Sequence, residues 1–223
     1  SLQHIIRNCE FLWRWEYKVN ANVLIPRQDT EILVEEVMKL TNSESRVLDM
    51  CTGSGCIIIS LAASGHTSEN GAVAIDISDD ALKVADYNKK YNNADYIKLI
   101  KSDMFSSSEC EQYKNEDNRF DVIVSNPPYI PTKDIDELSE EVRLHDPVLA
   151  LDGDTDGLKF YKAITKQSVN YLKENGYLCY EIGYNQAEDV RNIMEQCGYS
   201  GIKVIKDLAG LDRVVIGRLN NIN

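Results

Sequence analysis

The sequence predicts an α/β protein built on a doubly wound, mostly parallel sheet. Apolar segments alternate regularly with segments of helical period from residue 46 onward, and this alternation is typical of βαβ units. The last two apolar segments, 202–207 and 213–219, are joined by a turn too short for a helical crossover. One strand at that end is therefore expected to be antiparallel.

Seven segments are expected to form strands, because each is a short apolar run of the length that strands usually have. They are residues 46–50, 72–76, 96–103, 120–126, 176–182, 202–207 and 213–219.

Helices are expected between these strands and ahead of the first one. Residues 29–40 follow Pro26, and Asp29 is the expected N-cap. Residues 56–64 are rich in isoleucine, but the glycine turn before them and their length favour a buried helix. Acids begin the segment 78–91 and lysines end it, as in many helices. Two further helices are expected at about 157–173 and 186–197.

The start of the chain has a different pattern from the rest. Apolar and polar side chains alternate there, around Trp13, Trp15, Tyr17 and Val19, which predicts a short β-hairpin. We therefore divide the chain into a hairpin or linker over residues 1–22 and one domain over residues 23–223. The polar stretch 106–118 is expected to be a solvated loop or a frayed helix.

The composition is that of an acidic globular protein. The 223 residues are 43% hydrophobic and carry a net charge of −12, so the basic surface typical of nucleic-acid-binding proteins is missing. The six cysteines are scattered and form no Cys-x-x-Cys pair, which predicts reduced thiols in the cytoplasm and no metal site. We recognise no signal peptide and no membrane-spanning segment.

In doubly wound sheets, ligands bind at the carboxyl ends of the strands, so the residues that follow each strand are the candidate site. Gly53 and Gly55 follow the first strand and allow a sharp turn close to a ligand; an ordinary tight turn is an equally good interpretation. Asp76 follows the second strand and could accept hydrogen bonds from both hydroxyls of a ribose. The alternative role for Asp76, capping the next helix, suits Ser78 and Asp79 better.

After the third strand, Asp103 could accept a hydrogen bond from an adenine amino group. Met104 or Phe105 could cover a face of the ring, and plain core packing is the less favoured alternative for both.

Asn-Pro-Pro-Tyr, residues 126–129, follows the fourth strand. The two prolines end the strand abruptly. The Asn126 side-chain carbonyl and the Pro127 backbone carbonyl could together bind both hydrogens of a planar NH₂ group, and Tyr129 could stack on that group. A plain proline turn would not explain the asparagine or its position at the end of a strand.

These motifs, taken in order, resemble S-adenosylmethionine-dependent methyltransferases that modify planar amino groups. The segments VLIPRQDTEIL (23–33), SNPPYI (125–130), ALDGDTDGL (150–158) and DLAGLDRVVIGR (207–218) are similar to the PrmC/HemK family of peptide-chain release-factor glutamine methyltransferases. The resemblance covers essentially the whole chain. It implies a seven-stranded methyltransferase sheet and methylation of the glutamine in the Gly-Gly-Gln loop of release factors.

The resemblance also implies roles for particular residues. Asn126, Pro127 and Tyr129 would be catalytic, and Asn126 to Tyr129, Pro128 included, would bind the glutamine. The cofactor S-adenosyl-L-methionine, which leaves as S-adenosyl-L-homocysteine, would be bound by Cys51, Thr52, Gly53, Ser54, Gly55, Asp76, Asp103, Met104 and Asn126.

Three features depart from the family pattern. Cys51 stands at a position that is commonly glycine, and Gln28 stands where many members have a second proline. Family members also carry a helical N-terminal domain, and this chain begins after the place where that domain would end. We therefore expect a catalytic domain that binds the cofactor, with the affinity for the protein substrate left open.

The expected reaction is an in-line transfer that depends mainly on orientation. None of His4, His66 and His145 follows a strand, so we expect the proton to leave after the transfer, without a general base. The acidic segment 134–146 faces either the substrate or only solvent. The expected partner is a release factor, and the protein is expected to be a monomer that binds no membrane and does not use nucleic acid as its direct substrate.

The main alternative function is an amino methyltransferase acting on adenine or guanine in nucleic acid, since a flipped base could stack on Tyr129. A binding module without catalysis is a second alternative. A dehydrogenase is a third, although no Gly-x-Gly-x-x-Gly motif is present.

Overall fold

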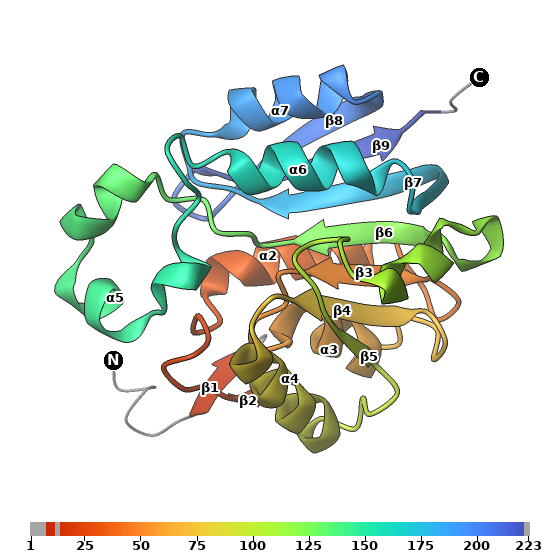
Figure 1. The fold of residues 1–223 in the computed structure, drawn as a ribbon, viewed down its shortest axis with the longest axis horizontal. Helices are drawn as coiled ribbons and strands as arrows, with labels where there is room; N and C mark the ends of the chain where they lie inside the picture. Colours follow the sequence, from red (N-terminus) through yellow and green to blue (C-terminus); the bar gives the residue numbers. More distant parts are fainter. Residues whose placement is uncertain (1–7, 12–13, 221–223) are drawn as a thin grey trace.

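The computed structural model describes residues 8–11 and 14–220. Its central feature is a seven-stranded sheet with the order β5-β4-β3-β6-β7-β9-β8 (Figure 1). The five neighbouring strands β5, β4, β3, β6 and β7 are parallel, and β9 runs antiparallel to both of its neighbours. The predicted mostly parallel sheet with an antiparallel strand near the C-terminus is thus confirmed. The strands are β3 (Val47–Met50), β4 (Ala72–Asp76), β5 (Lys98–Lys101), β6 (Phe120–Ser125), β7 (Leu172–Glu181), β8 (Tyr199–Lys206) and β9 (Asp212–Leu219).

Helices cover both faces of the sheet (Figure 1). Leu33 of α2 and Ile58 of α3 belong to the core on one face, while Tyr161 of α6 and Met194 of α7 belong to the core on the other. These side chains are fully buried, and burial of each stabilises the fold by roughly 1.5–3 kcal/mol. The helices are α2 (Gln28–Met38), α3 (Cys56–Ala63), α4 (Asp79–Tyr91), α5 (Glu140–His145), α6 (Lys159–Ser168) and α7 (Ala187–Gln196).

Two helix predictions need correction. Asp29 does not cap α2, because the helix begins at Gln28 and Arg27 is its N-cap residue; Asp29 lies in the first turn, 3.6 Å from the Arg213 guanidinium. Helix α6 is shorter than the predicted 157–173, because β7 already begins at Leu172, which pairs with Phe120. The predicted cap Ser78 is confirmed, since its hydroxyl accepts a hydrogen bond from the Ala81 amide.

The polar stretch 106–118 forms two short 3₁₀ helices, η1 (Ser108–Lys114) and η2 (Glu116–Asn118). Most of it is exposed, as predicted, but Cys110 and Tyr113 are buried in the core. The Tyr113 ring lies 5.1 Å from the Phe120 ring. The sequence interpretation missed these two anchors because they are isolated among polar residues.

Near the N-terminus, β1 (Asn8–Phe11) and β2 (Trp15–Lys18) pair as an antiparallel hairpin; Trp13 lies outside the described residues. The Tyr17 hydroxyl lies 2.7 Å from the Ser60 hydroxyl of α3, and the Lys18 amide donates to the side chain of buried Asn88 in α4. The hairpin is therefore fixed to two helices of the sheet domain. The division into residues 1–22 and 23–223 stays a prediction.

Within the described residues, no helix is long and apolar enough to cross a membrane.

Candidate active site

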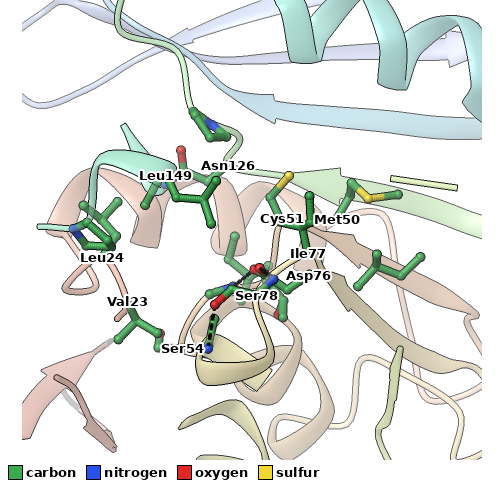
Figure 2. Close-up of a pocket in the computed structure, with 18 of the residues that line it drawn as sticks. Val23, Leu24, Met50, Cys51, Ser54, Asp76, Ile77, Ser78, Asn126 and Leu149 are labelled. Carbon is green, nitrogen blue, oxygen red and sulfur yellow. Dashed lines mark hydrogen bonds between the residues drawn. The ribbon is translucent and has the colours of Figure 1, made fainter. Parts of the chain in front are cut away.

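A cavity of about 440 Å³ lies at the carboxyl ends of β3, β4, β5 and β6, which is a usual size for a small-molecule site. Figure 2 shows Val23 and Leu24 on one side of it and Met50, Cys51 and Asp76 on the other. Its walls come from the segment before α2, from the four strand ends and from the start of α6. The lining includes Asn22–Pro26, Thr30, Met50–Ser54, Ile75–Ser78, Ser102–Met104, Asn126, Pro128, Leu149 and Phe160.

The loop between β3 and α3 is held in an unusual backbone conformation. Gly53 and Gly55 have φ of 55° and 82°, in the left-handed region that favours glycine. A Cβ on Gly55 would lie 2.7 Å from Ile59 Cδ1 and 3.3 Å from Ala85 Cβ, so a larger residue would have to displace the Ile59 side chain. Cys51 adopts φ 63° although it has a side chain, a conformation that costs about 1–3 kcal/mol. The loop therefore stores strain directly beside the cavity.

Asp76 at the end of β4 organises this loop. Its carboxylate accepts hydrogen bonds from the Gly53 amide at 2.8 Å and from the Ser78 amide at 2.9 Å. Burial raises the pKa of Asp76, and these backbone hydrogen bonds oppose that rise. Because a carboxylate has about four acceptor positions, Asp76 can still accept hydrogen bonds from a ligand in the cavity.

Asp49 lies completely buried in β3, beneath the loop. One carboxylate oxygen accepts a hydrogen bond from the Thr52 hydroxyl at 2.6 Å, and the other has no hydrogen-bond partner in the described part of the chain. Burial raises the pKa of Asp49 to about 7, and the Thr52 hydrogen bond opposes the rise. A buried acid with a strongly raised pKa is typical of a functional site. Asp49 was not among the residues expected to form the site, because it lies within the strand and not after it.

The Asn-Pro-Pro-Tyr segment forms a rigid corner above the cavity. Asn126 Nδ2 donates to Thr30 Oγ1 at 3.5 Å, and Thr30 Oγ1 donates to Glu181 Oε2 at 2.6 Å. Both Thr30 and Glu181 are buried. Burial raises the pKa of Glu181 to about 7. The Asn126 side chain is therefore linked by hydrogen bonds, through Thr30, to the buried Glu181 at the end of β7.

Tyr129 is fixed through its backbone. Gln186 Nε2 donates to the Tyr129 carbonyl at 2.9 Å, while Gln186 Oε1 accepts from the Gly183 amide. A Cβ on Gly153 would lie 2.9 Å from the Tyr129 backbone, so this neighbour has to be glycine. Burial raises the pKa of the Tyr129 hydroxyl to about 12, and the nearby Glu181 adds to the rise.

The cavity brings together most of the residues singled out from the sequence. Four of them do not line it: Gly55 packs against α3 and α4, Pro127 is buried, Phe105 is a buried core residue, and Tyr129 packs against the core. Asp103 is exposed at the rim, and Met104 has φ 49°. The residues that do line it are Cys51, Thr52, Gly53, Ser54, Asp76, Asp103, Met104, Asn126 and Pro128.

Sequence reasoning missed the lining residues that lie far from the strand ends. The segment Asn22–Pro26, Leu149 and Phe160 close the cavity from the side, and Thr30 and Glu181 lie behind Asn126. The signal for Thr30 was its place in the segment 23–33 that carries the family resemblance.

No histidine is among the residues that line the cavity, and His66 hydrogen-bonds instead to Thr41. Among the described residues, no group of three or more His, Cys, Asp or Glu side chains could hold a metal ion. The chemistry available here is hydrogen-bond acceptance and orientation by Asn126 and the carbonyl groups of the corner.

Comparisons with known proteins agree with this geometry. The model of a family described as a methyltransferase domain matches residues 41–212. The release factor glutamine methyltransferase of Thermodesulfovibrio yellowstonii is 41% identical over 96% of this chain and 75% of its own length. The enzyme of the same name from Fusobacterium nucleatum is 40% identical over 97% of this chain, which spans 59% of that relative.

Two solved structures are similar in fold. The release factor-specific protein-(glutamine-N5) methyltransferase of Alicyclobacillus acidocaldarius has 25% identity and a TM-score of 0.51, and the match covers 92% of this chain and all of that one. The methyltransferase SMU.776, solved in complex with SAH, has 13% identity and a TM-score of 0.60, and the match covers 92% of this chain and 53% of that one.

Proposed function

The chain belongs to the release factor glutamine methyltransferase family, and on that premise we propose that it methylates the side-chain amide nitrogen of the glutamine in the Gly-Gly-Gln loop of peptide-chain release factors. The methyl donor is S-adenosylmethionine. The observation that carries the proposal is the position of Asn126, which follows β6 and lines a cavity of cofactor size.

The residues around the cavity fit S-adenosylmethionine, which supplies an electrophilic methyl group on a positively charged sulfur. The loop 51–55, with buried Asp49 beneath it, would hold the amino-acid part of the cofactor. Asp76 would accept the ribose hydroxyls, and Asp103 and Met104 would contact the adenine. The strained backbone of the loop allows it to approach the ligand closely.

The glutamine would bind at the corner. Asn126 Oδ1 and the Pro127 carbonyl would accept its two amide hydrogens, while Pro128 and Tyr129 would wall off the amide plane. These hydrogen bonds add electron density to a nitrogen that is otherwise a poor nucleophile, and they hold it in line for attack. No general base is needed, because the proton can leave after the nitrogen has gained the methyl group.

The proposal extends to the setting of the reaction. The acidic charge of −12 suits a basic surface on a protein partner and disfavours nucleic acid as a direct substrate. We propose a cytoplasmic monomer that acts in translation termination. The cysteines support the cytoplasmic location, because all six are reduced and reduced thiols are usual in the cytoplasm.

The test is mass spectrometry of a release factor incubated with the chain and S-adenosylmethionine. We expect a gain of one methyl group on the glutamine of the Gly-Gly-Gln loop, and none in a release factor that carries Gln→Ala at that position. Calorimetric titration with S-adenosylhomocysteine tests the cofactor site separately. Methylation of added DNA or RNA, with none on the release factor, would overturn the proposal in favour of a nucleic-acid amino methyltransferase.

A further inference from the structure

Three side chains form a continuous hydrogen-bonded row from the sheet to the cavity. Glu181 Oε2 accepts from Thr30 Oγ1 at 2.6 Å, and Thr30 Oγ1 accepts from Asn126 Nδ2 at 3.5 Å. The row starts at the end of β7, passes through α2 and ends after β6. Glu181 is 1% exposed and Thr30 is 2% exposed. Thr30 and Asn126 both line the cavity.

From this row we infer that Glu181 and Thr30 are positioning residues that decide which end of the Asn126 amide faces the substrate. The inference rests on the proposed function, because it concerns how Asn126 receives an NH₂ group. It adds that the row decides whether Asn126 presents its carbonyl oxygen or its NH₂ group to the substrate.

The polarity follows from the inventory of donors and acceptors. An ionised carboxylate can only accept hydrogen bonds, so Glu181 takes the single hydroxyl proton of Thr30. The Thr30 oxygen then has only lone pairs left, and it must accept from its other neighbour. Asn126 meets this demand with its NH₂ group. Its carbonyl oxygen Oδ1 is thereby left to accept one of the two amide hydrogens of the glutamine.

Protonation of Glu181 would reverse this order. A carboxyl group can donate to the Thr30 oxygen, which frees the Thr30 hydroxyl proton to donate to Asn126 Oδ1. The Asn126 NH₂ group would then face the substrate NH₂ group, donor against donor. The protonated enzyme would therefore bind the glutamine poorly at the corner.

The surroundings of Glu181 place this change near neutral pH. Burial raises the pKa of Glu181 to about 7; the Thr30 hydrogen bond and the guanidinium groups of Arg213 and Arg27 oppose the rise, and Asp29 adds to it. The other titratable groups facing it are Tyr129 after β6, Tyr161 of α6 and Cys56 of α3, all in their neutral forms at pH 7 because burial raises their pKa values. Arg213 itself pairs with Asp207 at 3.1 Å.

A purely structural role would not require this arrangement. A buried carboxylate is costly unless it is paired, and in the described part of the chain Thr30 is the one side chain that hydrogen-bonds to the Glu181 carboxylate. A glutamine or a methionine at this position would fill the same space at a lower electrostatic cost. An acid at position 181 is explained by its hydrogen-bonded link, through Thr30, to Asn126.

The test compares Thr30→Val, which keeps the β-branched shape and loses the hydroxyl, with Thr30→Ser, which keeps the hydroxyl. Methyl transfer to the release factor is measured at saturating S-adenosylmethionine between pH 6 and 9. For the wild type we expect kcat/KM for the release factor to rise about tenfold per pH unit below pH 7 and to level off above it. Thr30→Ser keeps this profile. Thr30→Val loses about 10- to 100-fold at pH 8, with S-adenosylhomocysteine affinity changed by less than about threefold.

A rate and pH profile of Thr30→Val equal to those of the wild type would overturn the inference, as would an equal loss in Thr30→Ser. If the wild type itself were inactive, the result would count against the proposed function. A second measurement then tests the Glu181–Thr30–Asn126 row without relying on activity. In protein labelled with ¹³C at glutamate Cδ, the resonance missing in Glu181→Gln should titrate near pH 7. It should titrate at higher pH in Thr30→Val, because a hydrogen bond to the charged form is lost; an unchanged titration would overturn the inference.

Discussion

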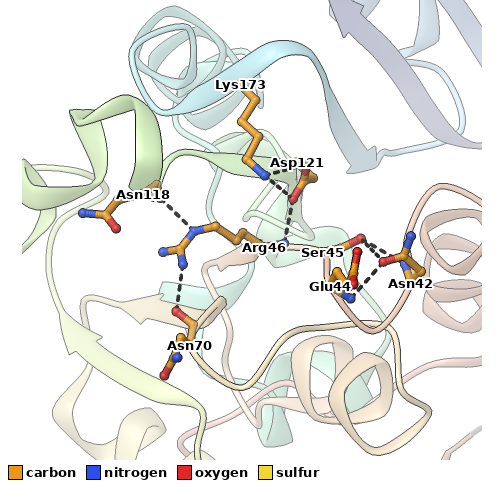
Figure 3. A network of polar contacts seen from close by, with 8 residues as sticks. All are labelled: Asn42, Glu44, Ser45, Arg46, Asn70, Asn118, Asp121 and Lys173. Atoms are coloured by element: carbon orange, nitrogen blue, oxygen red, sulfur yellow. Dashed lines mark hydrogen bonds and ion pairs between the residues drawn. The ribbon is translucent and has the colours of Figure 1, made fainter.

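The two ends of the sheet treat polar groups in opposite ways. At the amino end, Arg46, Asp121 and Lys173 form a network in which Asp121 accepts from the Arg46 amide at 2.8 Å and from Lys173 Nζ at 2.9 Å (Figure 3). The Arg46 guanidinium donates to the carbonyl groups of Asn118 and Asn70. These charged groups are partly exposed and mutually compensated.

At the carboxyl end, charges are buried and left incompletely paired. One Asp49 oxygen has no hydrogen-bond partner among the described residues, and Glu181 accepts a hydrogen bond from the Thr30 hydroxyl. Two residues with side chains, Cys51 and Met104, adopt positive φ beside the cavity. The other described non-glycine residues with positive φ are Asn93, Asp154 and Asn175, and these residue types tolerate that conformation. The carboxyl end thus carries the buried acids and the less tolerated backbone conformations, which is the pattern expected where a fold carries a function.

The largest expected difference between the two ends comes from asparagine substitutions. Asn126→Ala should lower kcat by about 10²–10³-fold, because an acceptor aimed at the reacting nitrogen is lost, while the affinity for S-adenosylhomocysteine changes far less. Asn118→Ala at the amino end should leave kcat within about twofold. Steady-state kinetics and calorimetry measure both. Equal losses of catalysis and cofactor affinity in Asn126→Ala would contradict the role of the corner.

The second difference concerns pH and stability. The folded-state pKa values of Asp49 and Glu181, about 7, lie above their usual values, so each group holds a proton in the folded state that the unfolded chain has lost. Their contribution to stability is fully present at low pH and is lost as pH rises toward 7, by up to about 1.4 kcal/mol per pH unit for each group.

Asp49→Asn should therefore flatten the fall in the free energy of unfolding between pH 5 and 7. Urea denaturation at pH 5, 6 and 7 measures it. A slope identical to that of the wild type would show that Asp49 is ionised in the folded state across this range.

The third difference separates stability from binding. Gly53 and Gly65 both have positive φ, of 55° and 75°, and both have open space where a Cβ would stand. Alanine at either position should cost about 1–2 kcal/mol of stability through backbone strain. Only Gly53→Ala should also weaken S-adenosylhomocysteine binding, because Gly65 follows α3 at the far end of that helix. If both variants bound S-adenosylhomocysteine more weakly, the effect would come from backbone strain in general and not from the place of Gly53 beside the cavity.

The smallest effect is expected at the amino end. Lys173→Met removes an ion pair whose side chains are 39% and 33% exposed, so it should cost less than about 1 kcal/mol and leave methyl transfer unchanged. Thermal unfolding at low and high salt measures the loss, which should shrink with salt. If Lys173→Met lowered the free energy of unfolding by several kcal/mol, the ion pair at the amino end would be far more important for stability than expected for an exposed pair.

The sequence was sufficient for the sheet because its signals are local. Apolar runs such as 46–50 and 72–76 mark the strands, and the short link before 213–219 marks the antiparallel one. The same local logic placed Asn126 and Asp76 at strand ends. It failed for Thr30 and Glu181, since their pairing joins positions 151 residues apart in the chain, and no periodicity records such a contact. It also misplaced the start of α2, where the tertiary contact of Asp29 with Arg213 replaces a local cap.

The strand order has a consequence for the assembly of the molecule during synthesis. Strand β9 lies between β7 and β8, so β8 leaves the ribosome before the strand that connects it to the sheet. A nascent chain that has not yet reached residue 212 leaves one edge of β7 open, and open edges invite pairing with other chains. Glu181 pairs in register with Val214, so its surroundings also remain incomplete until then. The half of the sheet that carries the acid behind Asn126 is thus the half that forms last.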